Sequence, residues 1–206
     1  MQGYILNINR VKNEDLIVSI LTKDRLKTLY RFYGARHSVI NIGYKIDFEA
    51  IYSAKSSIPM LREVLPLSYK WIFENNRFYV WQQFLKLLYK HLKDVEELNS
   101  FYFDMLDNSA AKLHKQNPKR VMIESYLSIL SHEGRLHNEF VCFLCDEGID
   151  TKSLKLTRSL MPTHLECANG FIFDKRKIQN LFDTKSTIEL NNDEIESLWD
   201  IVCRGL

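Results

Sequence analysis

The chain contains 206 residues with a formal net charge of +2, and 46% of its residues are hydrophobic. These values exclude an intrinsically disordered chain and supply enough apolar side chains for one large domain or two small ones. The longest unbroken apolar run, Phe140–Cys145, is too short to cross a membrane as a helix. The first residues lack the basic and apolar regions of a signal peptide, so we expect a cytoplasmic protein whose cysteines are thiols or metal ligands.

Basic residues are concentrated near the amino terminus. Residues 1–66 contain ten Lys and Arg against six Asp and Glu, whereas residues 67–206 contain 18 against 20. Residues 23–45 hold six of these basic side chains and a single acid, Asp24. This distribution favours a polyanionic partner for the amino-terminal part of the chain.

Short runs rich in Ile, Val, Leu, Phe and Tyr predict five β-strands in the first 66 residues. They are Tyr4–Asn9, Leu16–Leu21, Leu26–Tyr33, Ile46–Ser53 and Met60–Leu65. Turn-forming residues separate these runs, and five strands at this spacing suit a small closed antiparallel barrel. In the third run, alternation places Lys27, Leu29, Arg31 and Tyr33 on one face, which we expect to be basic and exposed to water.

Helical periodicity begins after a linker around Pro66. The apolar residues between Phe78 and Leu92 are spaced three and four apart, which predicts an amphipathic helix. A second helix is expected over Glu96–Leu113. A third helix is expected to start with Asn117 as its N-cap and Pro118 as its first residue, and to end at a glycine. Nearer the carboxyl terminus, we expect a short strand over residues 170–173 and a last helix capped by Asn192.

Two short pairs of metal-ligand residues lie between the third and the last of these helices. They are Cys142 with Cys145, in a CxxC pattern, and His164 with Cys167, in an HxxC pattern. A tetrahedral Zn²⁺ site takes four such ligands, usually as two pairs from two turns, and then has no open coordination position. We therefore predict one structural Zn²⁺ per chain. Buried cysteines beside an unrelated histidine are the alternative, while a redox-active CxxC is disfavoured because no strand–CxxC–helix unit surrounds it.

The expected fold is therefore α+β. An OB-like barrel of five strands is expected over residues 1–67, followed by a mainly α-helical domain over residues 68–206. The second domain would carry the zinc knuckle as an insertion at about residues 140–172. No repeat or low-complexity segment interrupts this arrangement.

Motifs for common catalytic sites are absent from the sequence. The glycines form neither a phosphate-binding loop nor a dinucleotide-binding fingerprint, and no Gly-x-Ser-x-Gly pattern is present. His132 and His137 are five residues apart with Gly134 between them, which does not fit the helical HExxH motif of metalloproteases. We therefore expect binding and no enzymatic activity. A zinc enzyme is the competing class, but it would need a site with only three protein ligands.

Several segments together resemble the RecO family of bacterial recombination mediators, as a divergent member. An acidic turn precedes a hydrophobic strand that ends in Thr22, and the next strand leads into Gly-Ala-Arg at residues 34–36. Farther along, a helix ends at Gly134 and is followed within about ten residues by the CxxC pair. Three features depart from the family pattern: Arg25 stands where a glycine is usual, few basic residues follow Arg36, and His164 replaces a cysteine.

The resemblance implies a DNA-repair function without nucleotide hydrolysis. Members of this family bind single- and double-stranded DNA and anneal complementary strands. They also contact the acidic tail of single-strand-binding protein and act with RecR to load RecA. The resemblance therefore implies DNA, RecR, single-strand-binding protein and, indirectly, RecA as partners, in the cytoplasm at the nucleoid.

Barrels of this type bind single strands with Lys and Arg on the phosphates and aromatic rings on the bases. In this barrel the expected cations are Lys27, Arg31, Arg36 and Lys45, and the expected stacking residues are Tyr33 and Tyr44. A second basic patch, which includes Lys119 and Arg120, would extend a DNA path or receive an acidic peptide, with a solvated loop as the alternative. The competing function for the whole chain is a protein-interaction adaptor with little DNA binding of its own.

Overall fold

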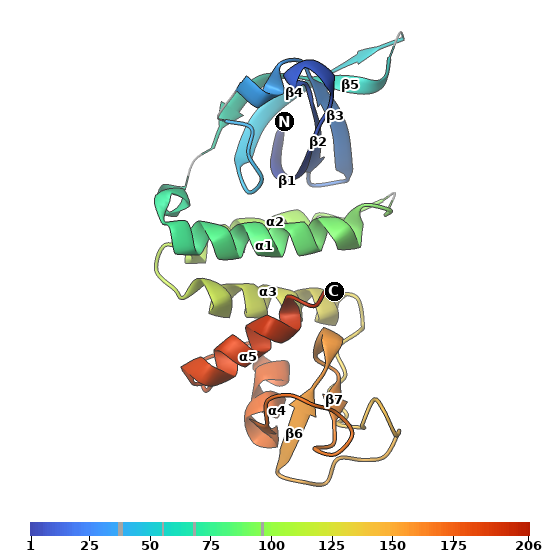
Figure 1. The fold of residues 1–206 in the computed structure, drawn as a ribbon, viewed down its shortest axis with the longest axis vertical. Helices are drawn as coiled ribbons and strands as arrows, with labels where there is room; N and C mark the ends of the chain where they lie inside the picture. Colours follow the sequence, from blue (N-terminus) through green and yellow to red (C-terminus); the bar gives the residue numbers. More distant parts are fainter. Residues whose placement is uncertain (37–38, 55, 68, 96) are drawn as a thin grey trace. The chain divides into compact units, whose positions relative to one another are not determined.

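The structure is a computed structural model that describes residues 1–206 except residues 37–38, 55, 68 and 96. The chain forms two compact units, Met1–His114 and Lys115–Leu206. The first unit contains a β-barrel and two helices. The second contains three helices and a small three-stranded sheet (Figure 1).

A closed five-stranded barrel forms the amino-terminal part of the first unit, as the sequence predicts. Its strands are β1 (Gln2–Arg10), β2 (Leu16–Leu21), β3 (Leu26–Arg31), β4 (Lys45–Ser53) and β5 (Ser56–Pro66). They are ordered β1-β2-β3-β5-β4, with β4 closing onto β1. The expectation of an entirely antiparallel barrel is wrong for one pair, because β3 and β5 run parallel where Tyr30 faces Met60.

The barrel interior is filled by aliphatic residues and Phe48. The core consists of Ile5, Leu16, Val18, Ile20, Leu29, Ile40, Ile46, Phe48 and Leu61. Leu29 faces Val18 across the β2–β3 ladder and is only 1% exposed. The expected basic, water-exposed face of the third strand is therefore wrong at its centre. Lys27 and Arg31 lie on the inward face on either side of Leu29.

Helix α1 (Asn75–Leu92) of the first unit packs against the barrel through Trp81. It follows the short 3₁₀ helix η3 (Lys70–Phe73), and α2 spans Phe101–Lys112. The indole N–H of Trp81 donates to the carbonyl of Gly43 at 2.9 Å. Gly43 has φ +96°, and a Cβ there would lie 2.9 Å from the Trp81 ring, so a larger residue would be strained. The expected start of the second helix, Glu96, lies outside the described residues.

A small polar network joins the barrel to α2. The Lys45 ammonium lies 2.7 Å from one Asp107 carboxylate oxygen and 3.0 Å from the other. The Tyr4 hydroxyl donates to Asp107 at 2.5 Å and lies 2.9 Å from the Tyr69 hydroxyl. Burial, Asp107 and Tyr69 all raise the pKa of Tyr4 far above its ordinary value, so this hydroxyl stays a donor.

The second unit begins with the helix that the Asn-Pro pair predicts. Helix α3 (Pro118–His132) has Asn117 as its cap, whose side chain accepts from the N–H groups of Lys119 and Arg120. It ends as expected near Gly134, which has φ +67°.

The boundary between the two compact units, at His114 and Lys115, differs from the expected linker near Pro66, because α1 and α2 group with the barrel. The expected folding domains, 1–67 and 68–206, stay a prediction.

The rest of the second unit combines short strands with two helices. These elements are β6 (Ser153–Leu156), β7 (Pro162–Thr163), β8 (Phe173–Asp174), α4 (Lys175–Thr184) and α5 (Asn192–Val202). The 3₁₀ helix η4 (Arg158–Leu160) lies between β6 and β7 in the sequence. Helix α4 was not expected from the sequence. The cap of α5 is Asn191, one residue earlier than expected, in a capping box with Glu194. Across the described residues, no helix is both long and apolar enough to span a membrane.

Replacing Asp107 with Ala should destabilise the first unit by about 1–3 kcal/mol, because it leaves the Lys45 ammonium without its counter-charge. Only 11% of the Lys45 side chain is exposed. Asp104→Ala, at an exposed position of the same helix, is the matched control and should change stability by less than about 0.5 kcal/mol. Urea unfolding of the two variants measures the difference, and equal stabilities would contradict the role of Asp107.

Candidate metal centre and nucleic-acid face

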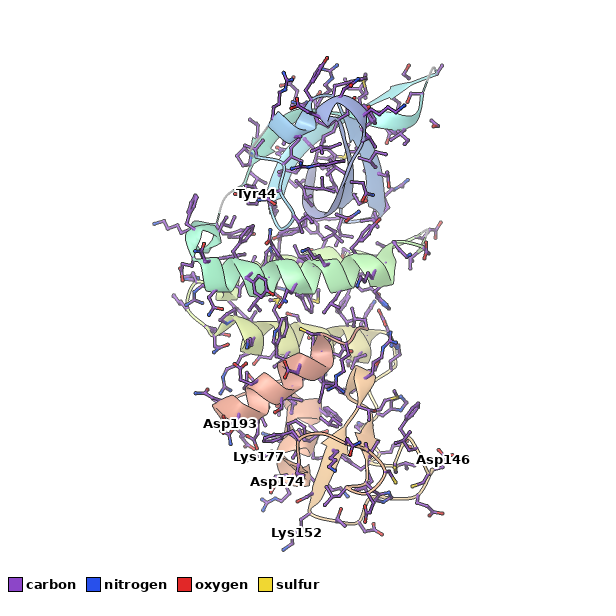
Figure 2. The ribbon with its side chains drawn as sticks, viewed as in Figure 1. Tyr44, Asp146, Lys152, Asp174, Lys177 and Asp193 are labelled. Atoms are coloured by element: carbon purple, nitrogen blue, oxygen red, sulfur yellow. The ribbon has the colours of Figure 1, made fainter. Side chains whose placement is uncertain are left out.

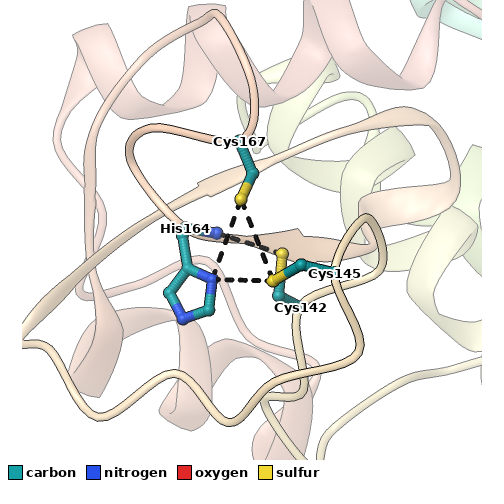
Figure 3. A group of neighbouring side chains, drawn as sticks. All are labelled: Cys142, Cys145, His164 and Cys167. Carbon is teal, nitrogen blue, oxygen red and sulfur yellow. Dashed lines mark hydrogen bonds between the residues drawn. The ribbon is translucent and has the colours of Figure 1, made fainter.

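The four predicted metal ligands come together in the second unit. The ligand atoms of Cys142, Cys145, His164 and Cys167 all lie within 4.8 Å of one another (Figure 3). The Cys145 sulfur is 3.3 Å from Nδ1 of His164 and 3.9 Å from the Cys167 sulfur. A tetrahedral ion with metal–sulfur bonds of about 2.3 Å would space its ligands at about 3.8 Å, so these distances fit one metal ion.

Backbone contacts orient two of the ligands, His164 and Cys142. Nε2 of His164 lies 3.1 Å from the carbonyl of Gly148, which leaves Nδ1 as the ligand when Nε2 carries the proton. Burial opposes ionisation of Cys142, but N–H groups of His164, Leu144 and Cys145 point at its sulfur and lower its pKa to about 6. Cys142 is therefore poised to bind as the thiolate.

The segment around these ligands has little regular structure to hold it. Residues 134–152 form no helix or strand apart from one isolated bridge between Val141 and Gly148. The strands β6, β7 and β8 contain four, two and two residues. A metal ion joining residues 142–145 to residues 164–167 would therefore stabilise both loops.

Loss of one ligand should release the metal and destabilise the second unit by several kcal/mol. Cys145→Ser is the test, with metal content measured by elemental analysis and unfolding followed by circular dichroism. Cys203→Ser is the matched control, because Cys203 follows α5 and is outside the ligand group. Full metal content in Cys145→Ser would contradict the assignment of this ligand.

One end of the barrel brings several of the predicted DNA-contacting residues together. Tyr33 is 53% exposed, and the Arg36 guanidinium lies over its ring at 5.0 Å from the ring centre. The N–H of Tyr33 donates to Asp15 at 2.6 Å, which holds the residue at φ +49° just after β3. Arg36 is exposed and also pairs with the exposed carboxylate of Glu14. Lys27 lies at the other end of β3, partly exposed.

Other predicted DNA-contacting residues are engaged within the protein. Lys45 pairs with Asp107, as described above. The ring of Tyr44 is half-buried, 5.8 Å from the ring of Phe78 on α1 (Figure 2). In the second unit, Lys119 pairs with Glu196, and Arg120 donates to the carbonyl of Leu190 at 2.7 Å and also to that of Thr187. The guanidinium of Arg120 thus holds the segment between α4 and α5.

Sequence reasoning missed three residues near Arg31 and Tyr33. Phe32 is 50% exposed, and Met60 and Arg62 come from β5; all three line one cavity together with Arg31 and Tyr33. Alternation placed Phe32 on the opposite face from Tyr33. The strand ends at Arg31, however, so the alternation stops before these two rings. Recognising the left-handed conformation at Tyr33 would have required knowledge of its contact with Asp15.

The first part of the chain matches a known family. Residues 1–72, which include all five barrel strands, match the family model described as RecO N terminal. A search of curated proteins found no match. The barrel is therefore similar to a RecO N-terminal domain, and this match supports a RecO-family assignment.

Proposed function

We propose that this chain is a non-catalytic, DNA-binding recombination mediator that acts in the repair of gaps and double-strand breaks. In this role it anneals single strands and helps to load RecA on DNA coated by single-strand-binding protein. RecR and the acidic tail of single-strand-binding protein are its protein partners. We place this activity in the cytoplasm, at the nucleoid.

The observation that carries the proposal is the closed barrel whose residues match a RecO N-terminal domain. A RecO N-terminal domain indicates a role in recombinational repair. The barrel also presents exposed aromatic rings and a guanidinium at one end, a combination that suits single-stranded DNA. Binding of this kind uses no nucleotide and no catalytic group.

Arg36 is the cation best placed to contact a phosphate. Its side chain is 65% exposed, and its only ionic partner among the described residues is Glu14, which is itself half exposed. Such exposed pairs contribute little to stability, so a phosphate can replace the carboxylate at low cost. Lys45 is less suitable, because its charge is already matched by Asp107 inside the first unit.

We propose that the metal is Zn²⁺ and that it is structural. Three thiolates and one imidazole form the ligand type that zinc prefers, and four protein ligands leave no position for an activated water. The metal would then act on the folding of the second unit and take no part in a reaction. Protein purified without chelators should contain about one Zn per chain.

Charge changes around Arg36 should shift DNA affinity in opposite directions. Arg36→Ala should weaken binding to single strands of every sequence and lower the salt slope by about 0.7, the share of one phosphate contact. Glu14→Gln should strengthen binding, because it removes the anion that competes with phosphate for Arg36. Fluorescence anisotropy with a labelled oligonucleotide, titrated with salt, measures both effects.

The wild-type protein with about three phosphate contacts should lose affinity roughly 20-fold between about 50 and 200 mM salt. Lys86→Ala, which removes one exposed charge from α1, is the matched control for Arg36→Ala and should bind like the wild type. If the wild-type protein binds no DNA even at low salt, the adaptor function replaces the proposed one.

A further inference from the structure

A cavity opens between β3 and β5 at one end of the barrel. These two strands pair at one position, where Tyr30 faces Met60. The space between them has a volume of about 380 Å³. It is lined by Tyr30, Arg31, Phe32, Tyr33, Met60, Leu61 and Arg62. This volume lies within the usual range for small-ligand sites, about 300–1,000 Å³.

Aromatic side chains form much of the cavity wall, and hydrogen bonds to Asp15 fix this part of the chain. Phe32 and Tyr33 are about half exposed, and the ring of Phe32 meets that of Tyr30 edge-on with centres 5.0 Å apart. The buried carboxylate of Asp15 accepts from the Tyr30 hydroxyl and from the backbone N–H of Tyr33. The exposed rings of Phe32 and Tyr33 therefore project from a backbone segment that is hydrogen-bonded to Asp15.

Arg31 supplies a polar group to this apolar cavity. One terminal nitrogen, Nη1, donates to the carbonyl of Leu61 at 3.0 Å. Its Nε is buried and has no hydrogen-bond partner among the residues that the structure describes. The absence of a side chain at Gly34 leaves room for the aliphatic stem of Arg31, because a Cβ there would lie 2.9 Å from the Arg31 Cγ. Because the Nε has almost no accessible surface, a ligand cannot reach it, and Arg31 contributes its positive charge to the cavity.

The cavity therefore suits the flat ring of a ligand that carries negative charge outside the cavity. The ring would lie against Phe32 and Tyr33, with the positive charge of Arg31 beside it. Arg36 beside Tyr33 and the exposed Arg62 place two guanidinium groups where flanking phosphates would lie. A phosphate inside the cavity fits less well, because five of the seven lining residues are aromatic or aliphatic.

We infer that this cavity binds one unpaired nucleobase of a DNA single strand, an inference that rests on the proposed DNA-binding function. A base within a duplex is stacked on both faces and cannot enter without being extruded. The cavity would thus make the barrel prefer single strands to duplex, while Arg36 contributes equally to both. Binding of a base in this cavity would also place Phe32, Met60 and Arg62 in the DNA interface.

The test compares two oligonucleotides of equal charge: an oligothymidylate of about 12 nucleotides and the same length of abasic deoxyribose phosphate. Phe32→Ala should weaken binding to the oligothymidylate roughly 5- to 150-fold and leave binding to the abasic strand unchanged. Phe32→Trp keeps a flat ring and should bind both strands like the wild type. Tyr52→Ala removes a 68% exposed ring on β4 outside the cavity and should also bind both strands like the wild type.

Retained binding of Phe32→Ala to the abasic strand shows that the variant is folded. Equal losses on both strands, or no loss on either, would overturn the inference while leaving the proposed function intact. If the wild-type protein binds neither strand at low salt, the proposed function fails, and the cavity has no DNA to bind. Wild-type binding that is equal for the two strands would show that no base enters the barrel.

Discussion

Closure of the barrel depends on the single parallel contact between β3 and β5. Every other neighbouring pair of strands is antiparallel and forms a longer ladder. A parallel pair cannot be joined by a tight hairpin, so the chain passes through η2 (Gly34–Arg36) and β4 before it returns as β5. The cavity lies beside this short contact, because Tyr30 and Met60 are among its lining residues. The same junction thus closes the core on one side and lies beside the proposed nucleobase cavity on the other.

Much of the positive charge in this chain is used inside the protein. Lys45 neutralises Asp107, Arg120 satisfies backbone carbonyls near α5, and Arg31 does the same for Leu61. A basic bias in the sequence therefore overstates the charge that a polyanion can reach. In the barrel, the basic residues that remain accessible are few, so the proposed DNA binding would have to draw on ring stacking as well as on phosphate contacts.

Local patterns in the sequence predicted the elements that local rules govern. The five strands coincide with runs of β-branched and aromatic residues. Helix α3 begins at the Asn-Pro pair, and this start could be predicted because a helix cap and the first turn lie within a few residues of each other. The metal ligands were predicted for the same reason, because each pair lies within one turn and the ligand types are specific to metals.

Features that depend on contacts between distant residues were not predicted. The inward position of Leu29 is decided by its pairing with Val18, and the burial of Lys45 by a carboxylate on α2. Helix α4 begins with Lys-Arg-Lys, a poor match to the positive end of a helix dipole, and its buried face is short. Asp174 caps this helix, and Lys177 pairs with Glu194 on α5, so tertiary contacts stabilise what the sequence pattern alone disfavours.

The ion pair between Lys45 and Asp107 also has a consequence for how this sequence can diverge. The two residues are 62 positions apart, yet neither can be replaced by an apolar residue alone without leaving a charge in a half-buried place. Substitutions at both positions together avoid the variant that has one unpaired charge. Among descendants of this sequence, the two positions should therefore change as a pair, and the order of the two mutations should be constrained by selection against the unpaired state.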